Sequence, residues 1–177
     1  MTRFSLQPHP SEPSSIVIEL FVELTDRGDG QYVAQYTVFG TTALLKIPTI
    51  AVPERADNLW QMTCFEVFLA DANGGYTEYN FSPSTQWACY YFSDYRMGMA
   101  NATPPRPPAI SSDVTAERLE VSAAFTAMGP FSEIALSAVI EARDGSKSYW
   151  ALKHPPGPPD FHHPDCFALS LAAPEHS

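Results

Sequence analysis

The chain has 177 residues, and its 20 Asp and Glu against 10 Lys and Arg give a net charge of −10. This acidic balance disfavours long-range attraction to nucleic-acid phosphates and to anionic membrane surfaces, and no Lys/Arg cluster provides a local exception. The length fits one domain, and an aromatic content of 12% favours β structure.

Residues 1–14 contain three prolines among Ser and Glu, and we predict a flexible lead-in there, followed by a single domain over residues 15–173. The N-terminus has one Arg and no apolar stretch before Pro8, so it does not resemble a secretory signal. There is also no run of about 18 apolar residues that would span a bilayer. An odd number of cysteines without a signal favours reduced thiols, and we expect a cytoplasmic protein.

Short apolar or alternating segments, separated by turn signals, predict strands along the rest of the chain. Residues 144–145, Asp-Gly, indicate a hairpin turn. Long proline-containing loops are expected at residues 93–115 and 154–165, and residues 41–58 are irregular. The predicted strands cover residues 15–24, 31–39, 63–69, 76–82, 87–92, 117–125, 132–141, 148–152 and 166–171. This pattern predicts an all-β antiparallel β-sandwich of jelly-roll or immunoglobulin-like type, without long helices.

The three strands within residues 63–92 carry the most functional information, because their side chains alternate between two faces. A four-residue turn at residues 83–86 would place Asn80 opposite Cys89 and Glu78 opposite Tyr91. Matching polarity places Glu66 beside Asn80, and a slip of one residue would reverse these faces. The predicted core face consists of Phe65, Val67, Leu69, Tyr79, Phe81, Tyr90 and Phe92.

The opposite face would collect Glu66, Glu78 and Asn80 together with Trp87 and Tyr91. Carboxylates and an amide between aromatic rings suit sugar recognition, because hydroxyl groups need fixed polar partners and pyranose rings stack on aromatic side chains. A polar and aromatic face of an antiparallel sheet is also typical of an ordinary solvated surface. A protein–protein surface is a third interpretation.

Three segments resemble uncharacterised bacterial DOMON-like proteins, a group similar to type 9 carbohydrate-binding modules. They are LWQMTCFEVFL (59–69), YTEYNFSPSTQWACYY (76–91) and HPPGPPDFHHPD (154–165). The resemblance implies a β-sandwich with a ligand site on one sheet or at its rim. The wider superfamily binds sugars or haem.

Haem-binding relatives imply a Met/His or Met/Lys axial pair. This chain offers Met62, Met97 and Met99 with several histidines, but none matches a haem-ligand position. We therefore expect no cofactor, with haem or Ca²⁺ as the alternatives. Asp71 and Asn73 beside two glycines would permit Ca²⁺.

The loops add candidate residues around the predicted face. Arg96 could clamp an anionic group, and the rigid loop carrying His154, His162 and His163 could form the rim of a pocket. A metal site there lacks a recognised zinc spacing. The predicted ligand-binding residues are Trp60, Glu66, Glu78, Asn80, Trp87, Tyr91, Arg96, His154, His162 and His163.

These observations predict a non-catalytic domain that binds a small carbohydrate or sugar-derived ligand. One alternative is a haem-binding electron-transfer domain. Another is a small glycoside-acting enzyme that uses Glu66 and Glu78 as a carboxyl pair. Oligomeric state is not indicated.

Overall fold

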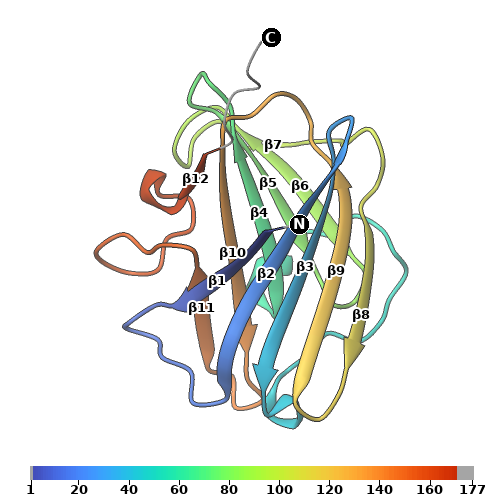
Figure 1. The fold of residues 1–177 in the computed structure, drawn as a ribbon, viewed down its shortest axis with the longest axis vertical. Helices are drawn as coiled ribbons and strands as arrows, with labels where there is room; N and C mark the ends of the chain where they lie inside the picture. The colour runs from blue at the N-terminus through green and yellow to red at the C-terminus, as the bar shows by residue number, and fades with distance from the viewer. Residues whose placement is uncertain (1, 171–177) are drawn as a thin grey trace.

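The computed structural model describes residues 2–170, and these residues form an antiparallel all-β fold (Figure 1). The strands are β1 (Thr2–Pro8), β2 (Val17–Gly28), β3 (Gln31–Gly40), β4 (Cys64–Ala70), β5 (Tyr76–Phe81), β6 (Trp87–Phe92), β7 (Ala100–Asn101), β8 (Ala109–Val114), β9 (Arg118–Thr126), β10 (Glu133–Glu141), β11 (Lys147–Ala151) and β12 (Leu169–Ser170). Three short 3₁₀ turns are η1 (Thr42–Leu44), η2 (Leu59–Gln61) and η3 (Pro164–Cys166). No helix in this part of the chain is long and apolar enough to cross a membrane.

The strands pair into one continuous, strongly curled sheet that resembles half a barrel. Its order is β7-β6-β5-β4-β10-β11-β1-β2-β3-β9-β8, and β12 adds to β10. The prediction of an all-β antiparallel fold is confirmed. The prediction of a sandwich with two separate sheets is not confirmed. The reason is β1, whose Leu6 pairs with Leu20 of β2 while its Gln7 pairs with Ala151 of β11. One strand therefore joins both halves of the sheet.

Three strands lie where the sequence indicates loops. β1 occupies part of the predicted lead-in, because Phe4 and Leu6 alternate with polar residues ahead of the prolines. β7 and β8 lie within the predicted loop 93–115. They form the two edges of the sheet, and their short, largely exposed sequences suit edge strands. Residues 171–173 of the predicted domain lie outside the described residues.

The curled sheet encloses the main core. Its inner face buries large apolar side chains from both halves, with Tyr36 and Phe65 in ring contact at 4.9 Å between centroids. The Tyr36 hydroxyl donates to the backbone carbonyl of Glu66 at 2.7 Å, so β3 is fixed against β4. The three cysteines are free thiols and are buried.

Apart from Tyr91 and the half-buried Ala70, the residues of strands β4, β5 and β6 are buried on both faces, whereas antiparallel sheets commonly leave one face to solvent. A second apolar cluster covers their outer face, opposite the main core. It includes Phe68, Tyr90, Phe92 and Phe161, and the last of these comes from the loop after β11. The polar face predicted from the sequence is therefore a covered surface, and the simple solvated interpretation is wrong for it.

Candidate functional site

A cavity of about 610 Å³ opens on the outer face of the sheet, between the strands and the loops that cover them. This volume lies within the range of roughly 300–1,000 Å³ that is typical of small-molecule sites. The strands supply its floor, and the loops after β1, β6 and β11 supply its walls. It is lined by Glu12, Trp60, Glu66, Glu78, Tyr90, Phe92, Arg96, Met99, Val139, Lys147, Tyr149, Pro159, Phe161 and His162.

Two buried carboxyl groups form the polar part of the floor. Glu66 of β4 pairs in register with Asn80 of β5, as the sequence predicts, so Glu66 and Glu78 share the outer face. Ser137 of β10 donates to one oxygen of Glu66 at 2.9 Å, and the Asn80 amide donates to one oxygen of Glu78 at 2.8 Å. Each glutamate retains a second oxygen for which no hydrogen bond to the described residues is seen.

The environment of both carboxyls favours their neutral form. Burial raises the pKa of Glu78 to about 7, although the Asn80 hydrogen bond and Arg96 oppose this shift. Burial also raises the pKa of Glu66 well above its ordinary value, and the field of Glu78 adds to the effect. At neutral pH the floor therefore holds two carboxyls that burial and mutual repulsion keep from ionising fully.

His162 faces Glu78 from the loop after β11. Its Nε2 lies 3.6 Å from Oε2 of Glu78, and its Nδ1 lies 2.8 Å from the Tyr76 hydroxyl. That hydroxyl also accepts from the backbone N–H of Arg96 at 3.1 Å. The Tyr76 hydroxyl donates to Nδ1 in the His162 tautomer that carries its proton on Nε2, and it accepts from Nδ1 in the other tautomer. Burial lowers the pKa of His162 to about 4, so near pH 6 its contact with Glu78 joins two neutral groups.

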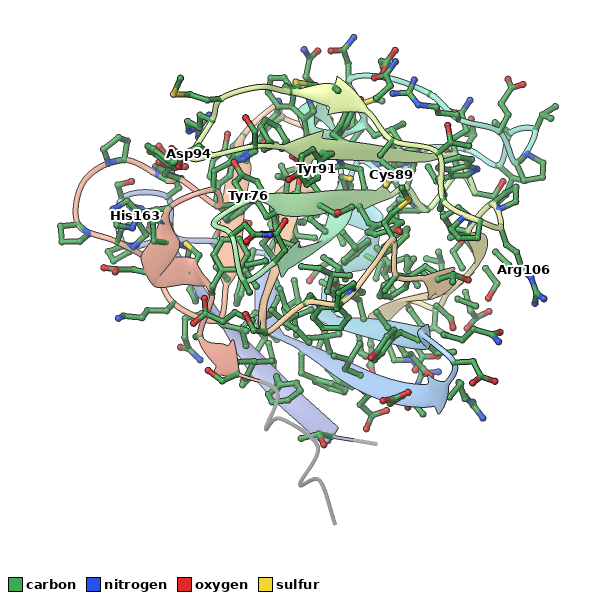
Figure 2. The ribbon with its side chains drawn as sticks, turned by 90° about the horizontal axis from the view of Figure 1, so that it is seen from above. Tyr76, Cys89, Tyr91, Asp94, Arg106 and His163 are labelled. Carbon is green, nitrogen blue, oxygen red and sulfur yellow. The ribbon has the colours of Figure 1, made fainter. Side chains whose placement is uncertain are left out.

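Asp160 fastens the two loops of the cavity wall to each other. The Arg96 guanidinium donates to its Oδ1 through Nη2 at 2.7 Å and through Nε at 3.2 Å, and the Tyr95 hydroxyl donates to its Oδ2. The loop after β6 is thereby held against the loop of His162, whose backbone N–H donates to the same carboxylate at 3.1 Å. Figure 2 shows the two loops, with Asp94 on one and His163 on the other, near Tyr76.

Aromatic side chains supply most of the remaining cavity wall. Tyr90 of β6 pairs directly with Glu78 of β5, and its hydroxyl donates to Asp57 at 2.7 Å. The Arg55 guanidinium lies 5.3 Å from the Tyr90 ring centroid. Trp60, in η2, is 50% exposed although it lines the cavity. An exposed Trp at the mouth of a cavity is free to contact a ligand.

The hairpin between β5 and β6 differs from the prediction by one residue. The structure pairs Phe81 with Trp87 and Glu78 with Tyr90, because the turn loop has three residues and Thr85 adopts a left-handed backbone with φ 78°. The slip moves Tyr90 and Phe92 to the cavity face. Trp87 moves to the main core, where it is 7% exposed, and Tyr91 moves to that same inner face.

The predicted site residues therefore separate into groups. Five of them line the cavity: Trp60, Glu66, Glu78, Arg96 and His162. Asn80 does not line it, but its amide donates a hydrogen bond to Glu78. Trp87 and Tyr91 lie on the opposite face, and Tyr91 bonds Asp71 at the rim of the sheet.

The other two histidines of the loop serve its structure. His154 contacts the backbone carbonyl of Gln7 at 2.8 Å, and His163 accepts from the backbone of Asp165 at the start of η3. Neither lines the cavity. Within residues 2–170 no cluster of three or more His, Cys, Asp and Glu could hold a metal ion. Asp71, the Ca²⁺ candidate, accepts from the backbone of Asn73 and Gly75 within its own turn.

Haem does not fit the histidine of the cavity. Both ring nitrogens of His162 face polar partners, and Met99 is the one methionine of the three predicted candidates that lines the cavity. An axial bond would require breaking the contact with Tyr76 or with Glu78. The donor set therefore does not suit an axial His/Met pair.

Sequence reasoning missed several lining residues, chiefly those from distant strands and loops. Val139, Lys147 and Tyr149 belong to β10 and β11, which lie beside β4 only because β10 pairs with it across the fold. The alternation of residues 132–141 identifies a strand, but no local signal identifies its neighbour. Glu12, Met99, Pro159 and Phe161 come from loops whose paths the sequence does not indicate.

Comparisons with known proteins show a fold and no family. No protein-family model and no curated protein matches the chain. The structure is similar to that of a protein from Bacteroides uniformis ATCC 8492 that is named for a proposed carbohydrate-binding role. The TM-score is 0.65 at 12% identity, over 96% of this chain and 86% of the other. This likeness shows a shared fold, and membership of the DOMON-like group stays a prediction.

Proposed function

We propose that this chain is a non-catalytic binding domain for a small carbohydrate-like ligand, which enters the cavity on the outer face of β4, β5 and β6. The observation that carries the proposal is the lining of this cavity. Hydrogen-bonding groups from Glu66, Glu78 and His162 lie on its floor and wall, and aromatic rings surround them. A few fixed polar groups in a concave aromatic wall are typical of small-ligand sites.

The state of the site before binding supports the proposal. Asn80, Ser137 and Tyr76 hold the polar side chains of the floor through hydrogen bonds, so little side-chain freedom is lost when a ligand binds. The loop walls are fixed by Asp160 and stiffened by prolines. The fold shared with the Bacteroides protein, whose name concerns carbohydrates, agrees with this proposal.

Binding is favoured over hydrolysis by the environment of the carboxyl pair. A glycosidase needs one protonated and one ionised carboxyl on either side of the scissile bond. Glu78, with a pKa of about 7, suits the acid. Glu66 does not suit the ionised partner, because burial and the field of Glu78 both oppose its charge. Turnover of p-nitrophenyl glycosides that Glu78→Gln removes would overturn this preference.

A thermal-shift screen tests the proposal. Purified protein is heated with neutral and amino monosaccharides, disaccharides, hemin or Ca²⁺ in separate wells. A sugar at about 100 times its Kd adds roughly 2.7 kcal/mol to the free energy of unfolding, which raises the Tm by about 5–10 °C. Trp60→Ala should lose the shift while keeping the Tm of the free protein. A shift with hemin or Ca²⁺ and with none of the sugars would contradict the proposal.

A further inference from the structure

The two carboxyls on the cavity floor lack a cationic partner. Neither Glu66 nor Glu78 lies within ion-pair distance of any Lys or Arg in residues 2–170, and the histidine facing Glu78 is neutral. Glu66 is 3% and Glu78 5% exposed, and both line the cavity. Buried carboxyls are normally paired with a cation or neutralised, because an unpaired buried charge is costly. Here the free space beside them is the cavity.

The cations that line the cavity do not supply this partner. The Arg96 guanidinium is bonded to Asp160. Lys147 belongs to β11, which is separated from β4 by β10, so the two strand axes lie roughly 10 Å apart. Glu12 adds a further acidic side chain to the lining. The carboxyls on β4 and β5 are therefore without a bonded cation among the described residues, and Lys147 lies two strands away from β4.

Aromatic rings adjoin the carboxyls on the same face. Glu78 has Phe68 opposite it on β4 and Tyr90 opposite it on β6, and Phe92 lies two residues further along β6. Tyr90 and Phe92 line the cavity. Carboxyl groups and aromatic faces together suit an ammonium group, because carboxylates attract it and ring quadrupoles add a cation–π term. A neutral hydroxyl would gain less from either.

We propose that the ligand carries a protonated amine, as a 2-amino-2-deoxy sugar does, and that this amine binds between Glu66 and Glu78 beside the rings of Tyr90 and Phe92. This inference rests on the proposed function, since it specifies the chemical class of the sugar. The remaining hydroxyl groups of the ligand then extend over β10 and β11, toward Tyr149 and Lys147. Those two side chains can donate hydrogen bonds to sugar oxygens.

Binding of such an amine is coupled to proton release. A cation favours the charged form of a carboxyl, so Glu78 gives up its proton as the amine binds. The groups facing this region are Glu12, Glu66, Tyr90, Tyr149, Lys147, Arg96 and His162. Of these, Arg96 stays charged between pH 5 and 7, and an amine on the ligand is predominantly protonated over the same interval. Affinity should therefore rise with pH over this interval.

Isothermal titration calorimetry with three probes tests the inference: glucosamine, glucose and N-acetylglucosamine, together with the galactose and mannose counterparts of each. We predict that one amino sugar binds about 30-fold or more tightly than its neutral parent and its N-acetyl derivative. Its affinity should increase more than about tenfold from pH 5 to 7. Heats measured in two buffers of different ionisation enthalpy report the released proton.

Variants separate the amine contact from the rest of the site. Glu66→Gln should lower the preference for the amino sugar, and Glu78→Gln, which removes the carboxyl that ionises on binding, should bring it close to one. The preference is the ratio of two affinities, that for the amino sugar and that for its neutral parent. Glu117→Gln, an exposed substitution outside the cavity lining, is the matched control and should change neither. Should a variant fail to fold, the pH dependence and proton release of the unmodified protein still decide.

The outcomes distinguish the two proposals. If neutral sugars bind as tightly as amino sugars, the amine inference is overturned and the proposed function stands. If no sugar in the panel binds, both are overturned. If an amino sugar is preferred but the preference survives both glutamine variants, the assignment of the amine to Glu66 and Glu78 is wrong.

Discussion

Glu66 and Glu78 lie on neighbouring antiparallel strands, two residues apart in register, and both carboxyls face one cavity. The pairing of β4 with β5 thus brings two acidic groups together at a place where burial opposes their charge. Burying these carboxyls changes their pKa values in the folded state only. The pH dependence of the free energy of unfolding therefore reports their environment without any ligand.

The first prediction concerns Glu78 and the stability of the free protein. Its folded pKa of about 7 exceeds its ordinary value of 4.5, so the folded state binds the proton more tightly. Stability is therefore highest below pH 4.5 for this group and declines as pH rises to 7, by on the order of 3 kcal/mol. Glu78→Gln should raise the Tm by roughly 5–10 °C at pH 8 and little at pH 4. Thermal unfolding by circular dichroism measures both.

His162 should show the opposite sign. Its folded pKa of about 4 is below the ordinary 6.5, so its contribution to stability is full above pH 6.5 and is lost as pH falls toward 4. His162→Asn removes this titration, so the variant should lose less stability than the wild type as the pH falls. The Tm of the variant minus the Tm of the wild type should therefore increase from pH 6.5 to pH 4. A difference that does not vary with pH would show that His162 titrates normally.

The two tryptophans of the predicted site should respond differently to truncation. Trp87 is in the main core, so Trp87→Ala should cost about 3–5 kcal/mol in the free energy of unfolding. Trp60 is half exposed, and Trp60→Ala should cost less than about 1 kcal/mol. Chemical denaturation measures both values. Equal losses would contradict the faces assigned to these side chains.

Asp160 should control the order of the cavity wall. Asp160→Asn weakens the bonds from Arg96, Tyr95 and the His162 backbone, since a neutral amide oxygen is a poorer acceptor for a guanidinium. We expect faster amide hydrogen exchange at residues 93–99 and 159–163, with β5 unchanged. Unaltered exchange in both loops would show that the prolines alone hold the wall.

Much of the sheet could be predicted from the sequence, because alternation and turn residues are local signals. Asp144 and Gly145 indicate the β10–β11 hairpin, and Gly145 adopts φ 88° there. The pairing of Glu66 with Asn80 follows from matching polarity. The curled single sheet does not follow, since it depends on β1 changing partners near Leu6, which no local pattern records.

The sequence predicts some of the residues that line the cavity and misses others, for two physical reasons. First, the turn at residues 83–85 contains Thr85 in a left-handed conformation without a glycine to signal it, and the resulting one-residue slip exchanged Tyr90 for Tyr91. Second, the covering loops reach the sheet through tertiary contacts such as Asp160 with Arg96, which join residues 64 positions apart.

The most direct test of carbohydrate-like ligand binding in this cavity is a titration followed by the indole N–H signals of the three tryptophans in a ¹H–¹⁵N spectrum. Trp60 lines the cavity, whereas Trp87 and Trp150 are buried in the main core. With the sugar that gives the largest thermal shift, we predict that the Trp60 signal moves progressively to saturation while the other two remain in place. A saturating response at Trp87 or Trp150 with Trp60 unmoved would contradict the account.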